Sequence, residues 1–257
     1  MNLFSRLFKS QKNVLNQQFN AALAPNEPFF VVGDIHGCDA LLSHLLTKIR
    51  DETTHQTPTI VFVGDYVDRG EESAKVLRRL FDMCRETENQ IICLAGNHEE
   101  MLLQFLDNPT KYGARWLRFG GLQTMASFGI RGVSSGTTGS DLETACVALR
   151  EEMGENLIAW LKGLPLFWQN GNVAVVHAGA DPALPISEQD SHNLKWGHKA
   201  FLQRSRNDGV WVIHGHTIVK KANSENGRIA LDTGAYATGR LTAAHISSDG
   251  LLRFLEA

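Results

Sequence analysis

Five stretches of this sequence share one pattern, and that pattern limits the folds that the chain can adopt. Each begins with an apolar run of strand length and ends in a polar turn that contains Asp, Asn or His. Nearly continuous apolar strands are typical of sheets that are covered on both faces. The sequence therefore predicts buried strands with polar groups at their ends. The five stretches are FFVVGDIHG (29–37), TIVFVGDYVDRG (59–70), IICLAGNHEE (91–100), NVAVVHAG (172–179) and GVWVIHGHT (209–217).

Helical patterns separate the first three of these strands. In residues 39–50 and 71–85, Leu and Val recur at helical spacing beside Lys, Arg and Glu. This alternation predicts an α/β fold, and in such folds ligands bind at the carboxyl ends of the strands. Residues 228–246 read as further antiparallel strands. We therefore expect a second sheet packed on the first.

The length of 257 residues and a hydrophobic content of 43% allow a sizeable core. We expect one domain over residues 28–257 and an N-terminal extension over residues 1–27, with a surface loop at 132–141. The extension contains Leu3, Phe4, Leu7 and Phe8 among basic residues. A frayed or packed segment is the favoured interpretation, and a short helix that touches a membrane surface is left open.

Charge and cysteine content narrow the possible partners and compartments. The formal net charge is -3, from 25 basic and 28 acidic residues, which favours neither nucleic acid nor an acidic membrane as a partner. The four cysteines are scattered without a CxxC pair, and no apolar run is long enough for a membrane span or a signal peptide. We therefore expect a cytoplasmic protein without a membrane span.

The polar groups at the strand ends are oxygen and nitrogen ligands, with no thiolate among them. Such a set suits Mn, Fe or Zn, of which we expect Mn. Six ligands exceed what one tetrahedral ion takes, whereas two divalent ions that share Asp65 would use them all and leave positions for water. The sequence thus predicts a two-metal site. Its candidate ligands are Asp34, His36, Asp65, Asn97, His177 and His216.

The order of these segments resembles the metallophosphoesterases. The residues within these motifs are similar to those of the phosphoprotein phosphatases, the family of serine/threonine phosphatases, and especially to those of its short bacterial and phage members. The motifs GDIHG, GDYVDRG, GNHEE, HAG and GHT stand in the family's order over roughly residues 28–250. The resemblance implies a calcineurin-like catalytic domain in which two packed mixed β-sheets are flanked by helices (αββα). It also implies that Asp34 and His36 bind one ion, that Asp65 bridges, and that the other three ligands bind the second.

The remaining motif residues suit phosphoester hydrolysis. Arg69 can pair with two phosphate oxygens through its guanidinium group. His98 follows the candidate ligand Asn97 and can protonate the leaving oxygen. The family resemblance pairs His98 with Asp68, which would keep the imidazole protonated. We therefore predict that His98, Asp68 and Arg69 are catalytic residues.

One position departs from the family pattern. Many relatives carry a tryptophan followed two residues later by an arginine that contacts the phosphate. Here the segment NLKWGHKAF places His198 at that position, after Trp196. His198 is therefore a candidate substrate-binding residue, and Arg115 or Arg204 could replace the arginine from a neighbouring loop.

Several other residues are expected to have structural roles. His214 precedes His216 by two residues, so we expect it to support the site rather than bind metal. The tryptophans, including Trp116, are expected in the core or the wall of a cleft. Cys38 is expected to be a small buried filler.

The motifs favour one function and leave two alternatives open. The favoured function is a metal-dependent phosphomonoester hydrolase, specifically a serine/threonine protein phosphatase with a metal-activated water. A hydrolase of dinucleoside polyphosphates, of the diadenosine tetraphosphate type, is an alternative within the same fold. A catalytically weak phosphate-binding scaffold is an alternative of another class, suggested by the missing arginine. The expected partner is accordingly a phosphorylated protein or a small phosphoester.

Overall fold

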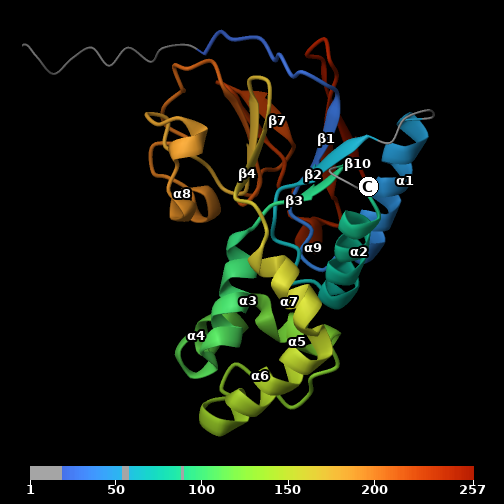
Figure 1. Ribbon diagram of the computed structural model, residues 1–257, viewed down its shortest axis with the longest axis vertical. Coiled ribbons are helices and arrows are strands. Elements are labelled where there is room, and N and C mark those ends of the chain that lie inside the picture. Colours follow the sequence, from blue (N-terminus) through green and yellow to red (C-terminus); the bar gives the residue numbers. More distant parts are fainter. Residues whose placement is uncertain (1–18, 54–57, 88–89) are drawn as a thin grey trace, which may run out of the picture.

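The computed structural model describes residues 19–53, 58–87 and 90–257, and its strands form two five-stranded mixed sheets (Figure 1). The first sheet has the order β10-β9-β1-β2-β3, and the second has the order β4-β5-β6-β8-β7. The strands are β1 (Phe29–Val32), β2 (Thr59–Phe62), β3 (Ile91–Cys93), β4 (Phe167–Asn170), β5 (Val173–Val176), β6 (Trp211–His214), β7 (Asn223–Glu225), β8 (Arg228–Ala230), β9 (Thr242–Ile246) and β10 (Leu252–Glu256).

Helices lie on the flanks of the sheets and in one extension (Figure 1). The α-helices are α1 (Asp39–Glu52), α2 (Ser73–Glu86), α3 (Asn97–Asp107), α4 (Pro109–Trp116), α5 (Leu122–Ser127), α6 (Gly139–Met153), α7 (Glu155–Lys162), α8 (Ser191–Trp196) and α9 (Ala235–Thr238). A segment with a kink at Gly120, η2 (Leu117–Gly121), joins α4 to α5, and a 3-10 turn, η3 (Ile186–Glu188), precedes α8.

The first sheet contains the predicted βαβ alternation. Strands β1, β2 and β3 are parallel, with Phe29 paired to Thr59 and Ile60 paired to Ile91. Helices α1 and α2 connect them at the positions where the sequence predicts helices. All five apolar runs contain a strand, so the strand prediction is confirmed.

The C-terminal strands divide between the sheets in a way that the sequence did not reveal. Strand β8 joins the second sheet parallel to β6, whereas β9 pairs antiparallel with β1 in the first sheet. The second sheet therefore exists, as expected, but residues 228–246 contribute one strand to each sheet. Its centre is formed instead by β5 and β6, which are parallel.

Alternation along the strands explains why these runs are apolar throughout. In β1, Phe29 and Val31 belong to the cluster between the two sheets, while Phe30 and Val32 belong to the cluster that contains residues of α1 and α2. Both faces of the strand are therefore buried, which removes the polar positions that a half-exposed strand would have. This packing confirms the predicted pair of sheets flanked by helices.

Helices α3 to α7 form an extension between β3 and β4 (Figure 1). Its core is continuous with the helical side of the first sheet, because Trp116 and Leu149 belong to the same cluster as the residues of α1. Residues 132–138 precede α6 without regular structure, in agreement with the loop expected there.

The N-terminal residues Leu3, Phe4, Leu7 and Phe8 lie outside the described part of the chain. Among the helices that the structure describes, none combines the length and apolar character needed to cross a bilayer. All four cysteines have free thiols, and Cys38 is partly buried.

Candidate active site

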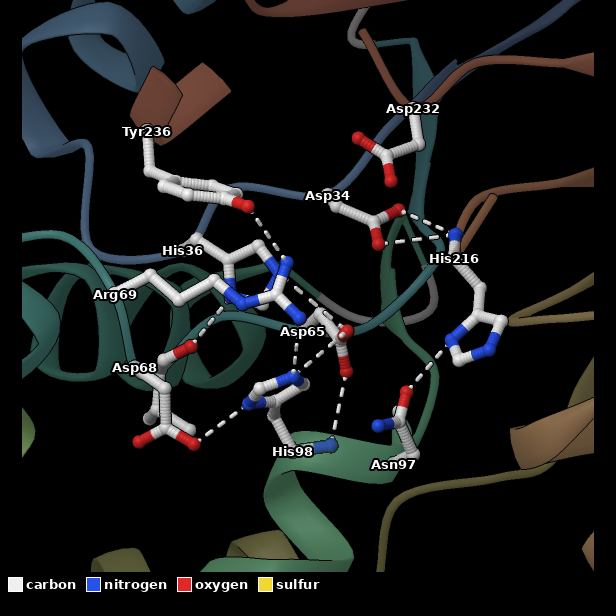
Figure 2. A network of polar contacts seen from close by, with 12 residues as sticks. Asp34, His36, Asp65, Asp68, Arg69, Asn97, His98, His216, Asp232 and Tyr236 are labelled. Atoms are coloured by element: carbon white, nitrogen blue, oxygen red, sulfur yellow. Dashed lines mark hydrogen bonds and ion pairs between the residues drawn. The ribbon is translucent and has the colours of Figure 1, made fainter. Parts of the chain in front are cut away.

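The turns after β1, β2 and β6, together with the start of α3, carry polar side chains into one cluster (Figure 2). Of the six non-glycine residues with positive φ in the described ranges, five lie in these turns. Such backbone conformations are costly and concentrate at functional sites, because the surrounding structure must hold them. The five residues are His36, Asp65, Asp68, Arg69 and His216.

Two glycines allow the turns to approach the site closely. A Cβ atom at Gly96 would lie 2.3 Å from Asp65 Oδ1, and one at Gly215 would lie 1.8 Å from Asp34 Oδ1. Any side chain at these positions would displace a carboxylate. The glycines of the GNHEE and GHT motifs are therefore needed for the geometry of the acidic groups.

Hydrogen bonds fix the orientation of two histidines. His36 Nδ1 lies 2.8 Å from the carbonyl oxygen of Val67, and His177 Nδ1 lies 3.1 Å from that of Val63. When Nδ1 donates to a carbonyl, Nε2 carries the lone pair that can bind a metal ion. The two Nε2 atoms lie 3.5 and 3.3 Å from the carboxylate of Asp65. Burial lowers the pKa of His36 to about 3 and that of His177 to about 4, so both rings are neutral at physiological pH.

The carboxylates of the cluster carry more negative charge than a buried site tolerates alone. Burial, and next the charge of Asp232, raise the pKa of Asp34 well above its usual range. Burial also raises the pKa of Asp232 to about 6 and that of Glu99 to about 7. In Asp65 burial acts in the same direction, but His177 and its neighbouring histidines outweigh it and lower the pKa. Divalent cations would offset this concentration of charge.

Two groups of candidate ligand atoms have the spacing of a metal site, and both include Asp65. One group is His36, Asp65 and His98, and the other is Asp65, His177 and His216; the atoms of each lie within 4.8 Å of one another. Asn97 Oδ1 lies 2.8 Å from both His177 Nε2 and His216 Nδ1. Neutral imidazoles, carboxylates and an amide oxygen form a donor set that fits two divalent ions. The assignment of individual ligands remains a prediction.

Asp34 lies beside the second group. Its carboxylate accepts the backbone N–H of His216, at 3.2 and 3.0 Å, so the turns after β1 and β6 are joined at the site (Figure 2). His214 is buried at the end of β6, and its Nδ1 lies 3.0 Å from the carbonyl oxygen of Gly215. Its position is compatible with the predicted supporting role.

His98 and Asp68 form a buried pair. His98 Nδ1 lies 2.7 Å from Asp68 Oδ2, and both side chains are at most 1% exposed. Burial lowers the pKa of His98, but the carboxylates of Asp65 and Asp68 raise it by more, so the net shift is upward. A protonated ring is a poor metal ligand and a suitable proton donor. The pairing therefore supports the predicted acid role over membership in the first ligand group.

Asp68 is held in place by the helical extension. Trp116 Nε1 donates to both of its carboxylate oxygens, at 3.1 and 3.0 Å, and Thr124 Oγ1 donates to Oδ1 at 2.7 Å. The same threonine hydroxyl accepts the backbone N–H of Asp68 at 2.9 Å. Trp116 lies in the core, as the sequence predicts, but its polar contact with the site was not foreseen.

Arg69 lies between the buried cluster and the surface. Its Nη2 is 3.2 Å from His98 Nε2, and its Nη1 donates to the hydroxyl of Tyr236 at 3.2 Å (Figure 2). The guanidinium group also stacks on the Tyr236 ring, 4.9 Å from the centroid. This position suits the predicted contact with phosphate oxygens.

His198 and Arg115 lie farther along the surface. His198 lines a cavity of about 360 Å³ together with Trp196, Lys199, Leu202 and His216, which we call the His198 pocket. Its Nε2 is 3.9 Å from a carboxylate oxygen of Asp181. His198 therefore shares a cavity with one candidate metal ligand, His216, which is compatible with the substrate-binding role that the family resemblance implies.

Arg115 is exposed and stacks on Trp196, with its guanidinium carbon 4.9 Å from the ring centroid. Neither Arg115 nor Arg204 lines the His198 pocket, but each is next to a residue that does: Arg115 stacks on Trp196, and Arg204 follows Gln203. Both remain candidate replacements for the missing arginine.

Several residues of the site escaped sequence reasoning. Asp232 is 2% exposed, and its carboxyl group faces Asp34 (Figure 2). It follows β8 in the run RIALDTG, so the pattern of an apolar run that ends in Asp and Gly could have revealed it. Glu99 accepts backbone N–H groups from Asp65 and Tyr66 at 2.8 Å, and so holds the turn after β2. Tyr236 had no comparable sequence signal.

Comparisons with known proteins agree with this geometry. An asymmetrical bis(5'-nucleosyl)-tetraphosphatase, PrpE, from Bacillus velezensis is 28% identical over 82% of this chain and 86% of its own length. Serine/threonine-protein phosphatase 1 from Salmonella typhimurium is 27% identical over 84% of this chain and 91% of its own. Among solved structures, a putative diadenosine tetraphosphatase aligns with a TM-score of 0.59 and 22% identity over 93% of this chain and 99% of that one, which shows a common fold.

The sequence profile of the calcineurin-like phosphoesterases matches residues 27–220, which span all five strand-end segments that carry the candidate metal ligands and the acid pair. The match explains why neutral imidazoles and carboxylates converge on Asp65, since enzymes of this family use divalent metal ions. The chain belongs to the calcineurin-like phosphoesterases and is a metal-dependent phosphoester hydrolase.

Proposed function

We propose that this protein hydrolyses dinucleoside polyphosphates and divides a dinucleoside tetraphosphate unequally. The sequence motifs favoured a protein phosphatase, but the similarity to tetraphosphatases supports the alternative better. The observation that carries the proposal is the presence of a pocket on each side of the candidate metal site. A substrate with a nucleoside at both ends of a phosphate chain needs space in both directions.

The two pockets differ in volume, but both are lined by aromatic and cationic side chains. The first is the His198 pocket, which reaches His216 and contains Lys199. The second is a cavity of about 680 Å³ that begins at Arg69 and is lined by Arg118, Phe119 and Tyr236, which we call the Phe119 pocket. Cationic side chains attract a polyphosphate, and aromatic rings offer surfaces for bases.

The roles of the site residues follow from their positions. Two divalent ions held by Asp34, His36, Asp65, Asn97, His177 and His216 would lower the pKa of a bound water and place positive charge beside the phosphoryl group. Arg69 would bind phosphoryl oxygens through its guanidinium group, which the hydroxyl of Tyr236 orients. His98, held by Asp68, would donate the proton that the leaving oxygen needs.

A serine/threonine protein phosphatase remains a second candidate, because the similarity to the Salmonella enzyme covers most of both chains. The same buried cluster serves either reaction, since both transfer a phosphoryl group to water. The pockets distinguish the two candidates, because a phosphopeptide does not require two base-sized cavities.

The test compares substrates at equal concentrations of Mn-loaded enzyme. We expect kcat/KM for diadenosine tetraphosphate to exceed that for a phosphoserine peptide by at least about 10-fold, a difference of about 1.4 kcal/mol. Anion-exchange chromatography should show AMP and ATP as products. The Asp65→Asn variant, purified in parallel, controls for contaminating hydrolases. A preference for the phosphopeptide would support the protein phosphatase instead.

A further inference from the structure

We propose that the Phe119 pocket binds the nucleobase next to the phosphate that Arg69 contacts. This inference rests on the proposed hydrolysis of dinucleoside polyphosphates and adds a specific base-binding site to it. Its observations are the continuity of the pocket with Arg69, the chemistry of the lining, and the rigid attachment of the Phe119 segment to the catalytic turn.

The pocket adjoins the candidate phosphate site through a shared side chain. Arg69 lines the cavity and also lies 3.2 Å from His98 Nε2 on the buried side. A phosphate bound by Arg69 would therefore hold its attached nucleoside at the mouth of this pocket. The volume of about 680 Å³ is within the range of about 300–1,000 Å³ that small-molecule sites occupy.

The lining offers both stacking surfaces and polar groups. Phe119 is 48% exposed and Tyr236 is 38% exposed, although both are aromatic residues that usually gain stability from burial. A base that stacks on such a ring contributes about 1–3 kcal/mol. Gln123 also lines the cavity, and its amide makes no hydrogen bond to any residue in the described ranges. It can therefore donate to and accept from the edge of a base.

The segment that carries Phe119 is fixed against the catalytic turn. Gly120 has φ of 112° at the kink in η2, and its carbonyl oxygen accepts the backbone N–H of Arg69 at 3.3 Å. A Cβ atom at Gly120 would lie 2.5 Å from Arg69 N, so only glycine permits this approach. Phe119 is thus held at a constant position relative to the residue that contacts phosphate.

The two residues that orient Asp68 lie on either side of this turn. Trp116 precedes η2 and Thr124 follows it, and both donate to the Asp68 carboxylate. The segment that carries Phe119 is therefore attached at three points, to the acid pair through Trp116 and Thr124 and to the Arg69 turn through Gly120. Such preorganisation suits the recognition of a rigid, planar group rather than a flexible peptide side chain.

The test compares two inhibitors that differ only in the base. AMP and ribose 5-phosphate each compete with p-nitrophenyl phosphate for the Mn-loaded enzyme, and the ratio of their inhibition constants isolates the contribution of the base. We expect AMP to bind about 10-fold or more tightly than ribose 5-phosphate in the wild type. Phe119→Ala should reduce this ratio to near 1, and Phe119→Trp should preserve it.

Leu251→Ala is the matched control, because Leu251 is also an exposed apolar residue but lines neither the Phe119 pocket nor the His198 pocket. It should leave the ratio unchanged. A ratio near 1 in the wild type, an unchanged ratio in Phe119→Ala, or equal losses in both alanine variants would overturn the proposal. Thermal melting of each variant confirms that the fold persists.

The inhibitor assay and the assay of diadenosine tetraphosphate hydrolysis together separate this inference from the proposed function. If diadenosine tetraphosphate is not hydrolysed but the AMP ratio depends on Phe119, the base site is supported and the dinucleotide substrate is rejected. If the tetraphosphate is hydrolysed with a ratio that is independent of Phe119, the function stands and the base site is rejected.

Discussion

The buried cluster of candidate ligands and the surface around it differ in the elements that form them and in the exposure of their side chains. The cluster is formed by strand-end turns, and seven of its side chains are at most 3% exposed. The surrounding rim comes from helices and irregular segments, and its apolar residues are 38–55% exposed. The cluster residues are Asp34, His36, Asp65, Asp68, Asn97, His98 and His177, and the rim residues are Phe119, Leu202 and Tyr236.

This difference suggests separate roles: the cluster carries out the reaction, and the rim determines which substrates are preferred. The cluster is fixed by residues with positive φ, by hydrogen-bonded imidazoles and by glycines that pack against carboxylates. Its preorganised geometry can therefore act on any phosphoester that reaches it. The rim has few such constraints and decides which groups fit beside the phosphate. Changes in the cluster should therefore affect all substrates, and changes in the rim should affect the ratio between substrates.

Removal of divalent ions should have the largest effect. Dialysis against a chelator should reduce turnover of both p-nitrophenyl phosphate and diadenosine tetraphosphate by at least about 1,000-fold, because the ions supply the nucleophile. Addition of Mn should restore both rates. Retention of activity on either substrate after exhaustive chelation, checked by elemental analysis, would contradict a common metal-dependent cluster.

His98→Ala should have a smaller effect that depends on the leaving group. Loss of the acid should lower kcat on phosphoserine by about 100-fold or more, because an alkoxide is a poor leaving group. Diadenosine tetraphosphate and p-nitrophenyl phosphate release more stable anions and should lose much less. Initial rates on the three substrates provide the measurement. Equal losses on all three would remove His98 from the acid role.

Thr124→Val should act through Asp68. The change removes one hydrogen bond to a buried carboxylate oxygen, which Trp116 Nε1 still contacts at 3.1 Å, and one from the backbone N–H of Asp68, which still reaches Ser73 Oγ at 3.1 Å. Loss of a hydrogen bond to a charged group costs about 1.5–3 kcal/mol of folding stability. We expect a lower melting temperature and a kcat on phosphoserine that falls by about 10-fold. Thr124→Ser keeps the hydroxyl and should restore kcat. If Thr124→Ser were as slow as Thr124→Val, the hydroxyl would not be the relevant group.

His198→Arg should have the smallest effect and should act on one class of substrate. The new guanidinium in the His198 pocket would add to that of Arg69. It should lower KM for diadenosine tetraphosphate by up to about 5-fold, with little change in kcat, because an exposed charge pair contributes at most about 1 kcal/mol. His192→Arg is the matched control, since His192 lies on α8 but does not line the pocket. Equal KM changes in both variants would indicate a general effect of charge.

The same contrast explains what the sequence could predict. The cluster follows from apolar runs that end in polar turns, and every predicted ligand lies at such an end. Asp232 also follows an apolar run, but the sequence pattern of residues 228–246 predicts only strands there. Phe119 and Tyr236 could not be predicted, because their positions depend on the kink at Gly120 and on the fold of α9 rather than on any periodicity.

The assignment of strands to sheets was also beyond local patterns. Strands β8 and β9 are similar short apolar runs, yet they belong to different sheets. Both strands bury a residue in the same cluster between the sheets, Ile229 from β8 and Ala244 from β9, so burial of an apolar residue does not distinguish them. Local sequence determines that a strand forms, whereas the tertiary fold determines which neighbour it pairs with.

The central claim is that Asp65 is shared by two ions. Equilibrium dialysis with Mn followed by elemental analysis counts the ions bound per chain in the wild type and in Asp65→Asn. We expect two ions in the wild type and fewer than one in the variant, because a neutral amide cannot supply the charge that holds two cations close together. One ion in the wild type, or two ions retained by Asp65→Asn, would contradict the shared site.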